Sequence, residues 1–107
     1  MAQVSLTATA TTRIEDANPT TNYNANAYIQ VGEWNGGSAK DRALVKFDLS
    51  SIPSDATITS ATLRLYDEAQ NYSSNTRTMS VYRVLRAWVA NQATWNVYST
   101  GNSWGTA

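Results

Sequence analysis

Residues 58–66 read Ile-Thr-Ser-Ala-Thr-Leu-Arg-Leu-Tyr, a stretch in which apolar and polar side chains alternate. Side chains on a β-strand point alternately to the two faces of the sheet, so a period of two predicts a strand with one buried face. The side chains expected to point inward are Ala61, Leu63 and Leu65, and those expected to point outward are Thr62, Arg64 and Tyr66. No stretch keeps the 3.6-residue period of an amphipathic helix, so the sequence predicts an all-β fold.

Four further segments carry strand signals, with turn-forming residues between them. They are residues 4–11, 27–31, 43–49 and 78–85. Asn18-Pro19 predicts a loop, because the residue before a proline is disfavoured in the helical region and Asn-Pro favours turn initiation. Five or six strands separated in this way predict one antiparallel β-sandwich, jelly-roll-like, over residues 1–107.

Composition excludes several classes of function. The 107 residues carry eight basic and eight acidic side chains, so no net charge draws the chain to nucleic acid. No apolar run approaches the roughly 20 residues that span a bilayer, so we expect no membrane insertion. The chain has no histidine and no cysteine, which excludes His-based acid–base chemistry, thiolate or imidazole metal sites and disulfides. Its adjacent carboxylate pairs point to opposite faces of a strand, so we expect no enzyme.

Five ordered segments resemble a known family. They are Asn18–Tyr23, Val31-Gly32, Arg42–Phe47, Phe47–Leu65, and Val81–Val84 followed by Trp88 and Thr94-Trp95-Asn96. Together they are similar to the DNRLRE (disaggregatase-related) domain and to the carbohydrate-binding modules that overlap with it. The resemblance implies a non-catalytic β-sandwich module that binds polysaccharide, in an extracellular or surface-exposed location. Relatives continue with more strands, so the chain corresponds to the N-terminal part of the family's domain. Three explanations follow: a neighbouring chain supplies the missing strands, the strands rearrange, or the sequence is a fragment. We favour the first and expect a homo-oligomer or a partner chain.

A polar loop with one large aromatic residue is the best candidate for glycan binding. Trp34 is flanked by Asn35 and two glycines, and a tryptophan face can stack on a sugar ring while polar neighbours bind its hydroxyls. Lys40 and Arg42 follow and could meet carboxylates or sulfates, and Tyr72 lies in another polar loop. The alternatives are that Trp34 packs over the sheet or in a subunit contact, and that the two cations are ordinary surface charge.

The remaining aromatic and oxygen-bearing residues carry weaker signals. Trp88, Trp95 and Tyr82 are expected to pack in the core or at the rim of a sheet, and Trp104 is a candidate for docking into a partner. The loop residues with hard oxygens could hold calcium, although turn formation explains the asparagines equally well. These residues are Glu15, Asp16, Asn18 and Asn22.

Two functions from different classes follow. The first is a non-catalytic module that binds glycan through Trp34 and nearby polar groups. The second is a structural subunit of a surface filament, layer or virion, assembled by strand completion between chains. No secretory signal is visible after Met1, which is compatible with the second function.

Overall fold

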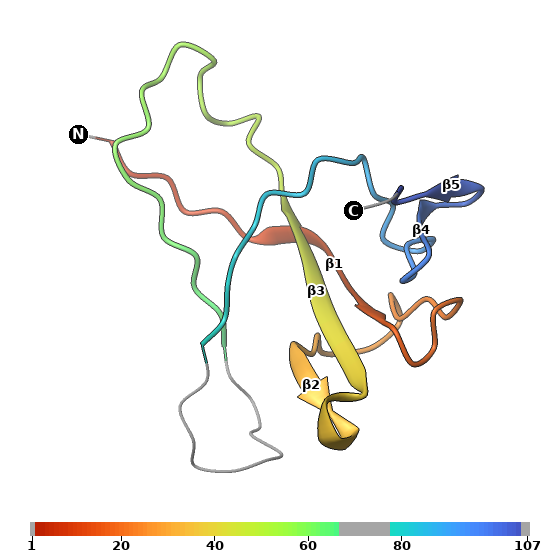
Figure 1. Cartoon of the computed structure of the whole chain (residues 1–107). Coiled ribbons are helices and arrows are strands. Elements are labelled where there is room, and N and C mark those ends of the chain that lie inside the picture. Colours follow the sequence, from red (N-terminus) through yellow and green to blue (C-terminus); the bar gives the residue numbers. More distant parts are fainter. Residues whose placement is uncertain (1, 67–77, 106–107) are drawn as a thin grey trace.

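Two antiparallel sheets and one short 3-10 helix form the regular structure of this computed structural model, which describes residues 2–66 and 78–105 (Figure 1). The elements are β1 (Ala8–Glu15), β2 (Gly32–Trp34), η1 (Asn35–Gly37), β3 (Ala39–Phe47), β4 (Val97–Ser99) and β5 (Asn102–Ser103). The described residues contain no α-helix, so the prediction of an all-β antiparallel fold is confirmed. The two sheets are compatible with a β-sandwich; that two layers close on each other stays a prediction.

The long β1–β3 pair is the centre of the first sheet, whose strand order is β1-β3-β2. Thr12 stands opposite Leu44 and Arg13 opposite Ala43, with an irregularity between Ala8 and Ala10. Alternation of small, β-branched and charged residues suits both strands to a sheet whose two faces differ. Because β3 lies between β1 and β2, it is the strand with hydrogen-bonded neighbours on both edges.

The carboxyl-terminal segment, residues 88–104, covers one face of this sheet, and the two together form the core. The buried cluster consists of Ile14, Leu44, Trp88 and Ala93. Partly buried side chains pack around it: Ala10, Ala90, Trp95, Tyr98 and Trp104. Each large apolar side chain removed from water contributes about 1.5–3 kcal/mol, so this cluster is the main source of stability. The packing role expected for Trp88 is confirmed, since the residue is 4% exposed.

The loop after β1 is fixed to the same carboxyl-terminal segment. The side-chain amide of Asn22 donates to the carbonyl oxygens of Ala90 and Ala93, both at 2.8 Å. The backbone N–H of Asn96 donates to the carbonyl of Pro19 at 3.2 Å. The predicted Asn-Pro loop is therefore present, and it joins the sheet to the segment that covers it.

The second strand lies later in the chain than the sequence predicts. Residues 27–31 form no strand, and β2 begins at Gly32, the residue expected to end a strand. The reason is the tight connection through residues 35–38, which holds Trp34 opposite Ala39. Gly36 and Gly37 supply the positive φ angles of 69° and 85° that this turn needs. Hydrogen-bonded pairing between β2 and β3 therefore begins directly beside this turn. The first strand is likewise shifted, from residues 4–11 to Ala8–Glu15.

The predicted strands at residues 58–66 and 78–85 are wrong for this structure, which assigns no strand to either. Figure 1 draws both as open tubes without strand arrows. Among the described residues, no backbone hydrogen bond joins either segment to another part of the chain. Leu63 and Leu65, expected inward, are 42% and 54% exposed. A β-strand needs a neighbouring strand with which its backbone N–H and C=O groups form hydrogen bonds. The alternating pattern predicts which side chains share a face, but it does not provide that neighbouring strand.

Candidate functional site

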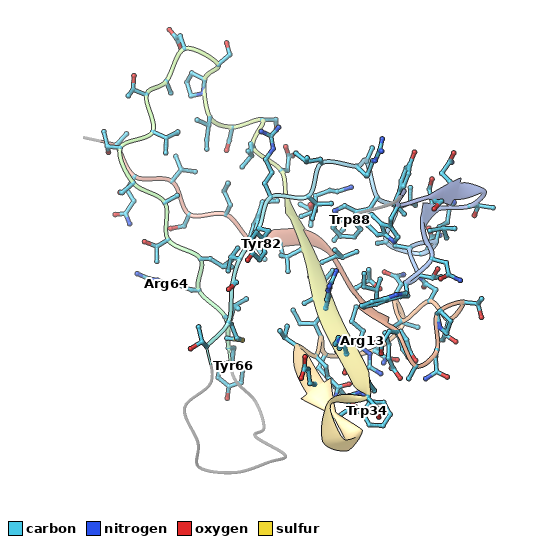
Figure 2. All side chains as sticks on the ribbon, viewed as in Figure 1. Arg13, Trp34, Arg64, Tyr66, Tyr82 and Trp88 are labelled. Carbon is cyan, nitrogen blue, oxygen red and sulfur yellow. The ribbon has the colours of Figure 1, made fainter. Side chains whose placement is uncertain are left out.

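Trp34 lies on a hydrogen-bonded edge strand and still exposes its ring. β2 pairs with β3 on one side only, and Trp34 stands opposite Ala39, which is buried. The tryptophan is 43% exposed. Figure 2 shows it at the end of the sheet, beside the turn that leads into β3. Backbone pairing therefore places this residue on the sheet edge, and its ring surface is open to solvent.

The register places Trp34 and the two candidate cations on opposite faces of the sheet. Residues directly opposite in an antiparallel pair share a face, so Trp34 shares one with Ala39, whereas Lys40 stands opposite Glu33. Lys40 and Arg42 are two residues apart on β3 and share the other face. A ligand that contacted Trp34 and Lys40 together would have to cross the exposed edge of β2.

The other residues proposed from the sequence lie in different places relative to Trp34. Asn35 is the first residue of η1 and follows Trp34 directly. Tyr72 lies outside the described residues. The guanidinium of Arg42 lies 4.9 Å from the centre of the Trp95 ring, a cation–π contact with the carboxyl-terminal segment. Arg42 is thus engaged with its own chain.

A charged cluster occupies the same face as Trp34, and the sequence did not reveal it. Glu15 stands opposite Asp41, and both are buried. Arg13 approaches Glu15 at 3.6 Å and lies 4.2 Å from the centre of the Tyr23 ring. The signal that could have found the cluster was the alternation of Arg13 and Glu15 on β1, but only the register with β3 adds Asp41.

Burial controls the electrostatics of this charged cluster. It raises the pKa of Asp41, with Glu15 and Asp16 adding to the effect and Arg13 opposing it. Burial also raises the pKa of Tyr23, with further contributions from its hydrogen bond to Glu15 and from the Glu15 charge. Within the described residues, Nε and Nη1 of Arg13 and Oδ1 of Asp41 are buried without a hydrogen-bond partner. The cluster therefore keeps unused donors and an unused acceptor side by side.

The opposite face carries a series of contacts between cations and aromatic rings. Besides the pair of Arg42 with Trp95, the Lys46 ammonium lies 4.6 Å from the centre of the Trp88 ring and donates to the Trp88 carbonyl at 2.9 Å. Arg86 lies 5.9 Å from the Tyr98 ring centre. The contacts of Arg42 and Lys46 attach β3 to its covering segment, whereas the contact of Arg86 joins two parts of the carboxyl-terminal region.

Two expectations about aromatic residues are wrong. Trp104, a candidate for docking into a partner, packs on its own chain: its ring is 5.8 Å from Tyr98 and its Nε1 donates to the Thr94 carbonyl at 2.8 Å. Tyr82, expected to pack in the core or at a rim, is 83% exposed because its segment has no sheet to pack on.

The candidate calcium ligands do not gather around one point. The Asn18 amide donates to Glu15 at 2.6 Å, and the Asn22 amide donates to two carbonyls of the carboxyl-terminal segment. Asp16 Oδ1 accepts from the Lys40 backbone N–H at 2.6 Å. Within residues 2–66 and 78–105, no three acidic side chains are grouped so that they could hold a metal ion. These side chains serve the loop and its contacts instead.

An antiparallel all-β unit with an exposed tryptophan is typical of a binding module. The model of carbohydrate-binding module family 96 matches residues 2–103, and the chain belongs to that family. A search of curated proteins and a search of solved structures each found no match. In the described part of the chain, no helix has the length and apolarity to cross a membrane.

Proposed function

We propose that this chain is a non-catalytic module that binds a glycan by stacking a sugar ring on Trp34. Membership of carbohydrate-binding module family 96 supports a polysaccharide partner. The observation that carries the choice of residue is the 43% exposure of a tryptophan whose backbone is held by strand pairing. Its exposed ring face matches the C–H face of a sugar, and its ordered backbone reduces the entropy that binding costs.

Polar groups on the same face would bind the hydroxyls. From Ala39 to Ala43, β3 runs about 13 Å, a length that suits a short oligosaccharide. Gly32 stands opposite Asp41, and the space where a side chain would extend from Gly32 is open. A sugar hydroxyl both donates and accepts, so it would pair with the unpartnered Arg13 N–H groups and the Asp41 oxygen once the side chains above them move aside, because all three atoms are buried in the structure.

The remaining candidates would contact a ligand that passes over the β2 edge. Lys40 is exposed on the far face, where its ammonium would attract a carboxylate or sulfate. Arg42 would act beside Trp95, with which it is already in contact. Asn35 and Tyr72 complete the proposed set as polar and aromatic contributors from the adjoining turn and from the segment outside the described residues.

The broader features of the proposal follow from the family. Carbohydrate-binding modules generally assist enzymes without catalysing a reaction and are often extracellular or surface-associated, so we assign both properties to this chain. Residues 1–107 would act as one module, and the narrower relationship to the DNRLRE domain belongs to the same proposal. No cofactor is required for stacking and hydroxyl recognition.

Binding measurements with purified polysaccharides test the proposal. Affinity electrophoresis or calorimetry would compare alginate, pectin and chondroitin sulfate with a neutral xylan. We expect Trp34→Ala to weaken binding by about 5- to 30-fold and Trp34→Phe to retain part of it, because one stacked ring is worth about 1–2 kcal/mol. Tyr82→Ala is the matched control, since it removes an exposed aromatic residue elsewhere. Lack of binding to every polymer, or equal binding by Trp34→Ala, would exclude Trp34 as the site.

A salt titration separates the two faces. If Lys40 contacts an anionic sugar, Lys40→Gln will lower the affinity for alginate but not for xylan, and added salt will reduce the difference. If the loss is equal for both polymers, the contribution of Lys40 is not electrostatic.

A further inference from the structure

Of the fifteen large apolar side chains that are exposed in the described part of the chain, nine lie on two segments that the proposed glycan site does not use. We name residues 58–66 and 78–85 the arm segments. Their exposed large side chains are Ile58, Leu63, Leu65, Tyr66, Met79, Val81, Tyr82, Val84 and Leu85. Figure 2 shows Arg64, Tyr66 and Tyr82 on these segments, away from β2 and its tryptophan. Exposed apolar groups on this scale mark a surface that becomes covered by another molecule.

The dimensions of the chain indicate how much surface remains to be covered. A compact monomer of this mass exposes about 5,900 Å², whereas this chain exposes 8925 Å². Its radius of gyration is 15.7 Å, against about 13 Å for a compact chain of this length. The chain therefore exposes about 3,000 Å² more than a compact monomer would. Two chains that form a permanent dimer bury about 2,000–5,000 Å² in total, so this excess is large enough to form such an interface.

The charges of the chain favour a second copy as the partner. The arm segments carry two arginines, Arg64 and Arg83, and no carboxylate. The rest of the described chain, residues 2–57 and 86–105, carries six carboxylates and five basic side chains. An arm segment of one copy is therefore attracted to the sheet of another, while two arm segments repel each other.

The sheet offers an edge of the right length. β1 has β3 on one side, and among the described residues no strand pairs with its other edge. A shallow hollow of about 290 Å³ lies beside that edge and is lined by Ala8, Thr9, Ala10, Thr11, Asn24 and Ala90, with no residue of β3. β1 spans eight residues, whereas the other outer strand, β2, spans three. β1 is thus the edge that can pair along most of a nine-residue segment.

We infer that two copies of this chain form a dimer in which residues 58–66 of each copy pair with β1 of the other. In this arrangement the backbone N–H and C=O groups of residues 58–66 and of β1 form hydrogen bonds with each other, and Leu63 and Leu65 become covered. It needs no glycan, so it stands or falls separately from the proposed function. Two-fold symmetry makes the contact closed, because each copy gives one segment and receives one.

The absence of cysteine allows a direct test by crosslinking. Thr11→Cys would be mixed with variants of the arm segment that each carry one cysteine, Ser60→Cys, Thr62→Cys and Arg64→Cys, under mild oxidation. We expect a mixed disulfide between the two chains for at least one position, because opposite residues of paired strands lie within disulfide reach. Ser103→Cys on β5 is the control and should give no mixed product above the level of random collision.

Mass measurements complete the test. Light scattering should give twice the chain mass of 11.7 kDa. Replacing both Leu63 and Leu65 by lysine should raise the dimer dissociation constant by about 100-fold or more, while Thr62→Lys, on the opposite face of the same segment, should have little effect. Circular dichroism would verify that both variants keep their fold.

Two results would overturn the inference. One is a chain that stays at 11.7 kDa at high concentration with its fold intact. The other is a Thr11→Cys/Thr62→Cys double variant whose disulfide closes within one chain, since that would place the arm segment on its own β1.

Discussion

The β1–β3 pair and the arm segments have the same alternating pattern of side chains, but they differ in how much of it is buried. Thr12, Ile14 and Leu44 are buried between the sheet and its covering segment. Leu63 and Leu65, on an equally regular pattern, are 42% and 54% exposed. The difference does not follow from β propensity, because both regions combine threonine with apolar β-branched and aromatic residues.

The contrast separates two requirements for a strand. Alternation sets which side chains share a face, and pairing sets whether the backbone groups are satisfied. β1 and β3 have each other and are covered by residues 88–104. The arm segments meet only the first requirement in a single chain, so they remain available for a partner.

Hydrogen exchange should show the largest difference between these regions. In dilute solution, amides of β3 should exchange several orders of magnitude more slowly than those of residues 58–66, because exchange from a paired core strand requires much larger opening. Raising the protein concentration should then slow exchange in the arm segments. If these segments were as protected as β3 in dilute solution, each would already have a partner within its own chain.

Matched leucine substitutions should give the next largest difference. Leu44→Ala, at a position that is 6% exposed, should lower the free energy of unfolding by about 2–5 kcal/mol. Leu65→Ala, at a position that is 54% exposed, should change it by no more than about 0.5 kcal/mol in the monomer. Urea denaturation followed by tryptophan fluorescence would measure both. Equal losses would mean that Leu65 is buried in the folded monomer.

The parts of the fold that could be predicted are those that local sequence alone determines. The strand at residues 43–49 was predicted within a few residues of β3, because its alternation and its flanking turns are local signals. The shift from residues 27–31 to β2 could not be foreseen, since it follows from the turn that places Trp34 opposite Ala39. The absence of strands in the arm segments depends on partners that no local pattern specifies.

The candidate site shows the same division. The exposure of Trp34 agrees with its polar, glycine-containing surroundings, but the loop predicted for it is wrong, because Trp34 lies in β2. The placement of Lys40 on the other face depends on a register that could not be predicted before β2 was located. Arg13, Glu15 and Asp41 come together only across two strands, so their cluster was missed.

Loosening the contact between the loop and the covering segment should have a smaller effect than loss of the core leucine. Asn22→Ala removes two hydrogen bonds of 2.8 Å to the carbonyls of Ala90 and Ala93. We expect a loss of about 1–3 kcal/mol, because both acceptors are left without their donor. Asn26→Ala, an exposed asparagine in the same loop, is the control and should be nearly neutral. An unchanged melting temperature for Asn22→Ala would show that the loop does not hold the covering segment in place.

The smallest expected effect concerns Asp41 and is best seen as a dependence on pH. Its pKa is raised in the folded state by burial, so the folded protein binds this proton more readily than the unfolded chain does. Stability therefore falls as the pH rises from the unfolded value near 3.8 through the folded pKa, and the full penalty remains above it. Asp41→Asn should be more stable than the parent at neutral pH, and the advantage should shrink as the pH falls toward 4.

Asp48 is the control with the opposite sign. The Ser50 backbone N–H lies 2.9 Å from its Oδ1 and lowers its pKa, so the stabilisation is present above 3.8 and is lost as the pH falls through the folded pKa. Asp48→Asn should thus be slightly less stable than the parent at neutral pH and equal to it in acid. Thermal unfolding of the three proteins between pH 3 and pH 7 would compare the slopes. If Asp41→Asn and Asp48→Asn shifted stability in the same direction, burial of Asp41 between β1 and β3 would not control its ionisation, and the paired region would be more open to water than its packing indicates.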